Sequence, residues 1–128
     1  MKTTRTPGSS VDSTDTDILS PTTIFELLDH DRRRYTLHYL SQKVGAVSLS
    51  ELAEQIALWE NQPTSDQYER ILTGLHHHHL PQLADAEIIR YDIDDETVTL
   101  LEMADQLTPY LQLAMPDDLS LSDGSGGT

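Results

Sequence analysis

The stretch SLSELAEQIALWENQPTSDQYERILTGLHHHHLPQL, residues 48–83, holds two helical patterns separated by one short break, and it decides the fold. Ser48 and Glu51 have the spacing of a capping box, in which each side chain bonds the other residue's free amide. This spacing predicts a helix over residues 49–60. The inward face of that helix is expected to consist of Leu52, Ala53, Ile56 and Ala57.

The second pattern begins after Pro63, where Thr64 or Ser65 is placed to cap a new helix. Apolar residues then recur at helical spacing as far as Leu83, which predicts a longer helix over residues 65–83. Two helices joined by such a short turn predict a helix–turn–helix, in which the second helix meets the partner.

Four consecutive histidines, His76 to His79, lie inside this second helix. At roughly 100° per residue, adjacent imidazoles point in different directions, so the four cannot close a tetrahedral metal site. His79, with His76 at its edge, falls on the apolar face, whereas His77 and His78 fall on the exposed side. At most two of them could bind one metal ion, and we expect no metal site. The run continues an apolar period on both sides, unlike a terminal affinity tag.

A β-hairpin is expected directly after this helix, because Ile88–Tyr91 and Thr97–Leu100 read as strands joined by an acidic turn. Further elements are expected at the flanks: a helix from Pro21 with Ile24, Phe25, Leu27 and Leu28 as its apolar face, a helix over 32–42 capped by Asp31, a very short strand within 44–47, and a helix over 103–113 bent at Pro109.

This order of elements is that of a winged helix–turn–helix, a mainly α fold with a small β-hairpin (α+β) and flanking N- and C-terminal helices. The domain is expected over residues 20–115. Residues 1–19, rich in Ser, Thr and Asp, and residues 116–128, which end in a Ser/Gly run, are expected to be disordered tails.

The chain is strongly acidic, with 22 Asp and Glu against 8 Lys and Arg and a formal net charge of −14. Such a charge repels nucleic acid and anionic membranes at low salt. Acids are spread along the whole chain and lysine is nearly absent, a pattern typical of halophilic archaea that keep molar salt inside the cell. An ordinary acidic protein is the alternative. The sequence contains no cysteine, so it has no disulfide, thiolate zinc site or cysteine nucleophile.

No apolar run reaches the length of a membrane-spanning helix, and Met1–Val11 lacks the apolar segment of a signal peptide. A soluble, cytoplasmic protein is therefore expected.

Two pairs of segments resemble known families. Val47-Ser-Leu-Ser-Glu-Leu-Ala-Glu-Gln-Ile-Ala57 and His79-Leu-Pro-Gln-Leu-Ala-Asp-Ala-Glu-Ile-Ile89 look like the helix–turn–helix of archaeal regulators distantly similar to arsenic-responsive repressors. More closely, Leu28-Asp-His-Asp-Arg-Arg-Arg34 with His78-His-Leu-Pro-Gln-Leu-Ala-Asp85 resembles uncharacterised haloarchaeal domains with a winged helix–turn–helix fold. The chain departs from the regulators at Pro81, and at Glu87, where a glycine usually ends the helix.

The resemblance implies a DNA-binding transcriptional regulator whose recognition helix, about residues 65–80, enters the major groove. Gln67, Arg70, Thr73 and His77 lie on the exposed face of that helix. Gln pairs with adenine, Arg with guanine, and Thr contacts either base or phosphate. The alternative is that these residues simply form a solvated helix face.

Arg32, Arg33 and Arg34 form the only basic cluster, and they could hold phosphates beside the groove. The alternative is that they pair with the neighbouring Asp29 and Asp31. The predicted wing argues against DNA, since Asp92, Asp94, Asp95 and Glu96 would meet phosphate with like charge. A winged-helix module that binds a protein and never contacts DNA is therefore the second hypothesis.

An enzyme is the least favoured class, because no nucleophile motif, phosphate-binding loop or paired-carboxylate arrangement occurs in the sequence. No cofactor is expected. The apolar residues of the two flanking helices could cover the core, or they could form a symmetric homodimer that matches a palindromic DNA site.

Overall fold

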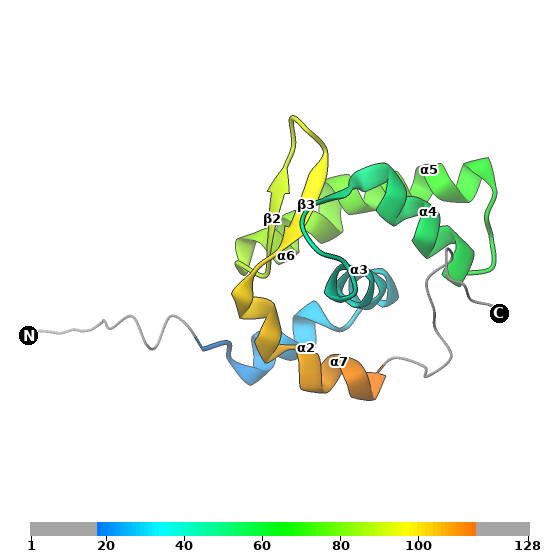
Figure 1. Cartoon of the computed structure of the whole chain (residues 1–128). Coiled ribbons are helices and arrows are strands. Elements are labelled where there is room, and N and C mark those ends of the chain that lie inside the picture. Colours follow the sequence, from blue (N-terminus) through cyan, green and yellow to red (C-terminus); the bar gives the residue numbers. More distant parts are fainter. Residues whose placement is uncertain (1–17, 115–128) are drawn as a thin grey trace, which may run out of the picture.

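The computed structural model describes residues 18–114, so nearly all of the two expected tails lies outside the described residues. The described part is mostly helical with one small antiparallel sheet, which confirms the predicted α+β class and its winged-helix-like arrangement (Figure 1). Within the described range, no helix combines the length and apolar character needed to cross a bilayer.

The helix–turn–helix consists of α4 (Leu49–Trp59) and α5 (Ser65–Gly74). Ser48 caps α4 by accepting a hydrogen bond from the Glu51 amide at 3.1 Å. The Glu51 carboxylate bonds the Tyr39 hydroxyl, so it contacts the preceding helix. Thr64 caps α5 by accepting from the Gln67 amide at 3.1 Å, which selects Thr64 over Ser65 as the cap.

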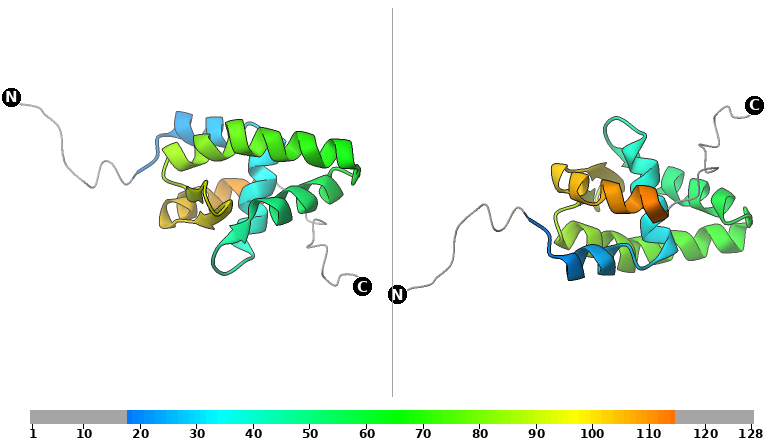
Figure 2. Two further views of the ribbon diagram at one scale, coloured as in Figure 1. Left: turned by 90° about the horizontal axis from the view of Figure 1, so that it is seen from above. Right: turned by 90° about the horizontal axis from the view of Figure 1, so that it is seen from below.

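The second helix continues from α5 through a π-helical turn, η2 (Leu75–His79), into α6 (Leu80–Asp85), and Figure 2 shows these segments as one rod along the molecule. In the π turn the Leu80 amide donates to the Leu75 carbonyl, five residues back. Pro81 follows at once, and its ring crowds the carbonyl four residues earlier while it offers no amide. We attribute the widened turn to this proline, inside a helix that the sequence predicts as regular.

The rod ends in a Schellman motif that includes a strained residue. The Ile88 amide donates to the Leu83 carbonyl, and the Glu87 amide donates to the Ala84 carbonyl, both at 3.0 Å. Glu87 takes a left-handed conformation with φ 63°, which favours glycine.

The sheet has the strand order β1-β3-β2, formed by β1 (Val47–Ser48), β2 (Ile89–Asp92) and β3 (Thr97–Leu100). The hairpin β2–β3 is the wing, with Asp92 opposite Thr97 at the turn. The wing also contacts the start of the helix–turn–helix, because the Leu49 amide donates to the Glu96 carbonyl at 2.8 Å.

Four flanking helices surround α4 and the rod: α2 (Pro21–Leu27), α3 (Asp31–Ser41), the 3₁₀ helix η3 (Glu102–Gln106) and α7 (Thr108–Ala114). His30, not Asp31, caps α3, since its ring nitrogen accepts from the Arg32 amide at 3.3 Å. The expected bend at Pro109 is a break between η3 and α7. Phe25 is not part of the buried face of α2, because it is 62% exposed and packs edge-on against Tyr110.

The core lies between α3, α4, the rod and the sheet, with α2, η3 and α7 closing it below (Figure 1). The predicted inward face of α4 is confirmed, since its four residues are at most 2% exposed. Other side chains that are at most 2% exposed are Thr36, Leu37, Leu40, Ile71, Leu75, Leu80, Leu83, Ile88, Ile89, Val98 and Leu107.

Candidate nucleic-acid interface

The outward face of the rod carries three of the residues predicted to contact DNA. Arg70, Thr73 and His77 follow one another at helical spacing and are all exposed. None of them forms a hydrogen bond or ion pair with another side chain in the described part of the chain. Their polar groups are therefore free to meet a partner.

Gln67, near the start of α5, is already engaged. Its amide nitrogen donates to a Glu60 carboxylate oxygen at 2.8 Å. Arg32 binds the same carboxylate with two nitrogens, at 2.9 and 3.1 Å. Burial alone would raise the pKa of Glu60, but the hydrogen bonds from Arg32 and Gln67 outweigh it and lower that pKa. Glu60 thus fixes α3 to the start of α5 and occupies both predicted DNA contacts.

Arg33 is buried, at 6% exposure, in the junction of α2, α3 and the rod. It donates to the Glu26 and Leu27 carbonyls at 2.9 Å, where it satisfies the C-terminal end of α2. It also donates to the Gln82 side chain at 2.7 Å. A guanidinium with these partners cannot reach a phosphate, so Arg33 is left out of the proposed DNA surface.

Arg34 is engaged as well, because its guanidinium bonds the Asp31 carboxylate and the Leu28 carbonyl. All three arginines of the basic cluster therefore have hydrogen-bond partners within the described part of the chain. This is the arrangement expected of a cluster that stabilises the fold.

The histidine run divides as the helical wheel predicts. His79 is 3% exposed, His76 is half-buried, and His77 and His78 are exposed. The His79 Nδ1 atom accepts a hydrogen bond from the Arg33 guanidinium at 3.2 Å, and the His79 ring lies 4.2 Å from the His30 ring, centroid to centroid. Burial, with the nearby charges of His30 and Arg33, lowers the pKa of His79 to about 4. His79 is therefore neutral at physiological pH.

Thr73 and His77 border a small hollow, of about 170 Å³, between the rod, the start of α4 and the wing. Leu49, Leu72 and His76 complete its floor, and Glu96 of the wing stands at its edge. His76 is held there by a 2.6 Å hydrogen bond between its ring nitrogen and the Tyr91 hydroxyl. The structure thus brings two predicted DNA contacts beside an acidic residue of the wing.

The rest of this surface is acidic. Tyr68 faces α4, and its pKa is raised by burial first and then by the charges of Glu54, Glu69 and Glu96. Arg70 lies about 160° around the helix from Tyr68, at roughly 100° per residue. One side of α5 therefore presents the Arg70 guanidinium and the Thr73 hydroxyl, while the side toward α4 carries negative potential.

Sequence reasoning offered Asp31, which pairs with Arg34, but it missed the partners of Arg32 and Arg33. Glu60 lies 28 residues from Arg32, and Gln82 lies 49 residues from Arg33. No local pattern links residues so far apart. Among residues 18–114, no group of three or more His, Asp or Glu side chains is placed to bind a metal ion.

Comparison with known proteins gives one match. A family model described as Domain of unknown function (DUF7344) matches residues 25–99, which is more than half of the chain. These residues run from α2 to β3 and include the helix–turn–helix and the wing. No curated protein and no solved structure matches the chain.

Proposed function

The chain belongs to the DUF7344 family, and we propose that its function is to bind double-stranded DNA as a transcriptional regulator. The proposal is for a cytoplasmic protein of a halophilic archaeon, acting without a cofactor and without catalysis. The rod formed by α5, η2 and α6 would enter the major groove.

One observation carries this proposal: the outward face of α5 and η2 presents Arg70, Thr73 and His77 beside a two-stranded wing, and their side chains form no hydrogen bond or ion pair with other side chains of residues 18–114. An exposed arginine on a recognition helix is suited to the two acceptors of guanine. Thr73 and His77, three and seven residues further on, would lie along the same groove wall. Arg90 is exposed on β2, and in this proposal it would meet the adjacent DNA backbone from the wing.

The acidity of the chain sets the conditions for binding. In molar salt the screening length falls to about 3 Å, so the wing carboxylates would repel phosphate only at contact. The same salt weakens the gain from counterion release, so base contacts must supply most of the affinity. Binding should therefore be selective for sequence and weak on non-specific DNA.

The test begins with selection of preferred duplexes from a random library in molar KCl, followed by titration by fluorescence anisotropy. The Arg70→Ala variant should lose roughly tenfold or more in affinity, which corresponds to a bidentate base contact of about 1–3 kcal/mol. Arg34→Ala removes the same charge from an arginine paired with Asp31, and it should bind like wild type. Failure of folded wild-type protein to enrich any duplex would refute the proposal.

A protein-interaction module remains the second candidate, and a specific observation favours it. Carboxylates on α4, α5 and the wing form no ion pair in the described part of the chain and act together on Tyr68 between them: Glu54, Glu69 and Glu96. Such a surface suits a basic protein segment better than a phosphate backbone.

Self-association is also proposed, through the apolar face shared by α2 and α7. Phe25, Tyr110 and Leu113 are 62%, 43% and 88% exposed on this face. Sedimentation should show a dimer that the Phe25→Ser, Leu113→Ser double variant converts to monomer. Ile93→Ser removes an apolar side chain that is 62% exposed on the wing, and it should leave the dimer intact. A monomeric wild-type protein would overturn this part of the proposal.

A further inference from the structure

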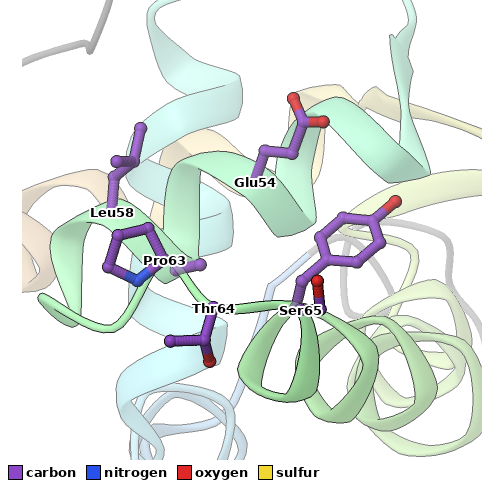
Figure 3. Close-up of a pocket in the computed structure, with 7 residues that line it drawn as sticks. Glu54, Leu58, Pro63, Thr64 and Ser65 are labelled. Carbon is purple, nitrogen blue, oxygen red and sulfur yellow. The ribbon is translucent and has the colours of Figure 1, made fainter.

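A hollow of about 370 Å³ lies between α4 and the start of α5, away from the proposed DNA contacts (Figure 3). One wall is apolar and is formed by Ala57, Leu58 and Pro63. Tyr68 gives the lining an aromatic part, and the Glu54 side chain extends from α4 at its side. The volume is at the small end of the range of roughly 300–1,000 Å³ that is typical of ligand pockets.

The charge of this hollow is negative and uncompensated. Its lining contains no Lys, Arg or His, and Glu54 makes no ion pair with any described residue. Burial raises the pKa of Tyr68 first, and the charges of Glu54, Glu69 and Glu96 raise it further, in agreement with the negative charge of this surface. A phosphate or carboxylate ligand is disfavoured there, because it would meet like charge without a cation to offset it.

The shape adds a second requirement. An occupant must place apolar groups against Leu58, which is 44% exposed, and against Pro63. It must also place a cation within reach of Glu54 and over the ring of Tyr68, where a cation–π contact is available. An arginine side chain meets both requirements, since its methylene stem is apolar and its planar guanidinium stacks on aromatic rings.

We propose that this hollow is a docking site for an arginine side chain of a basic segment in a partner protein. Glu54 binds the guanidinium, Tyr68 stacks on it, and Leu58 with Pro63 covers the stem. The inference goes beyond DNA binding, because Arg70 points to the opposite side of α5 and the two surfaces can be occupied independently.

The test uses the full chain and two synthetic peptides, Ac-Ala-Leu-Arg-Leu-Ala-amide and the same peptide with citrulline in place of arginine. Citrulline has the same shape and no charge. Binding is followed by amide chemical shifts of ¹⁵N-labelled protein, with N-acetyl-arginine amide as a probe for the side chain alone. The arginine peptide should shift the amides of Glu54, Leu58 and Tyr68, and it should bind roughly fivefold or more tightly than the citrulline peptide.

Two variants make the result specific. Glu54→Gln should reduce the arginine preference to near one, and Tyr68→Ala should weaken arginine binding by about threefold. Asp85→Asn removes the same charge from an exposed residue of α6, roughly 30 Å away along the rod, and it should change nothing.

Equal binding of the two peptides would overturn the proposal. So would shifts that map to another surface, or equal losses in Glu54→Gln and Asp85→Asn, which would mean general attraction to an acidic protein. Shifts produced only by N-acetyl-arginine amide, and not by the peptide, would point to a small-molecule site and also contradict the proposal. None of these results depends on DNA binding, so the two proposals fail separately.

Discussion

At the scale of single residues, the arginines illustrate how position decides role. Arg33 and Arg70 are chemically identical, yet Arg33 is 6% exposed with carbonyl and amide partners, whereas Arg70 is exposed without any among the described residues. Helical spacing predicts the exposure of Arg70. Helical spacing does not predict the environment of Arg33, because that environment depends on a contact between α3 and the rod, which comes much later in the sequence.

Arg33 should be a stabilising residue. Its replacement by Met would leave the Glu26 and Leu27 carbonyls and the Gln82 oxygen without their donor. We expect the free energy of unfolding, measured with urea, to fall by about 2–4 kcal/mol. Arg70→Met is the control and should change the free energy of unfolding by less than about 0.5 kcal/mol. Similar losses in both variants would contradict the assigned role.

His79 should make stability depend on pH. Its pKa is lowered to about 4 in the folded protein, from an ordinary 6.5, so the unfolded chain binds more protons between these values. The contribution is therefore fully present above about pH 6.5 and is lost as the pH falls toward 4, by roughly 3 kcal/mol in total. His30 and His38, whose pKa values burial also lowers, act in the same direction.

Urea unfolding of wild type and His79→Gln at several pH values measures this contribution. The variant should lose most of the stability change across that window, because glutamine does not titrate. His77→Gln alters an exposed ring and should keep the wild-type profile. An unchanged pH profile in His79→Gln would show that His79 is not the group responsible.

At the scale of elements, the sequence predicts type and order well and details of geometry poorly. The capped start of α4, the extent of the rod and both strands of the wing follow from local patterns of spacing and capping. The π turn at Leu75–His79 does not follow from them, because the apolar pattern of this segment fits an α-helical turn equally well. Its one local cause in the sequence is Pro81, which signals a disturbance but not its form.

The end of the rod offers a stabilising change. Glu87 adopts φ 63°, a conformation that costs a residue with a side chain about 1–2 kcal/mol. Glu87→Gly should raise the free energy of unfolding by about 0.5–1 kcal/mol, after the greater freedom of glycine in the unfolded chain is subtracted. Glu87→Ala removes the same charge without relieving the backbone and should give no such gain. A gain in both variants would assign the effect to charge.

The candidate interface shows the same limit. Spacing on a helical wheel predicts which residues of the rod are exposed, and Arg70, Thr73 and His77 are exposed in the structure. Gln67 falls on the same predicted face, but Glu60 at the end of α4 holds it against α3. Contacts between elements decide which side chains are free, and a periodic pattern within one element carries no information about them.

For the molecule as a whole, the large negative charge is the main factor that opposes a compact fold. A net charge of −14 on 128 residues destabilises the compact state through repulsion among carboxylates. In the described part of the chain, only three ion pairs offset it. If the protein is halophilic, added salt is therefore expected to stabilise its fold.

Thermal unfolding in increasing KCl tests this requirement. The Tm should rise steadily from about 0.1 M to molar KCl, where the screening length falls from about 10 Å to about 3 Å. NaCl should act similarly, because screening depends on ionic strength. A Tm that is constant or falls over this range would favour an ordinary acidic protein over a halophilic one.

Contact between duplex DNA and the outward face of α5 and η2 can be observed residue by residue by NMR. Amide chemical shifts of ¹⁵N-labelled protein would be recorded in molar KCl with and without the best selected duplex. The account predicts shifts centred on Arg70, Thr73 and His77 with weaker ones on the wing, and none around Arg33. Shifts absent with every duplex, or centred on the hollow beside Tyr68, would contradict it.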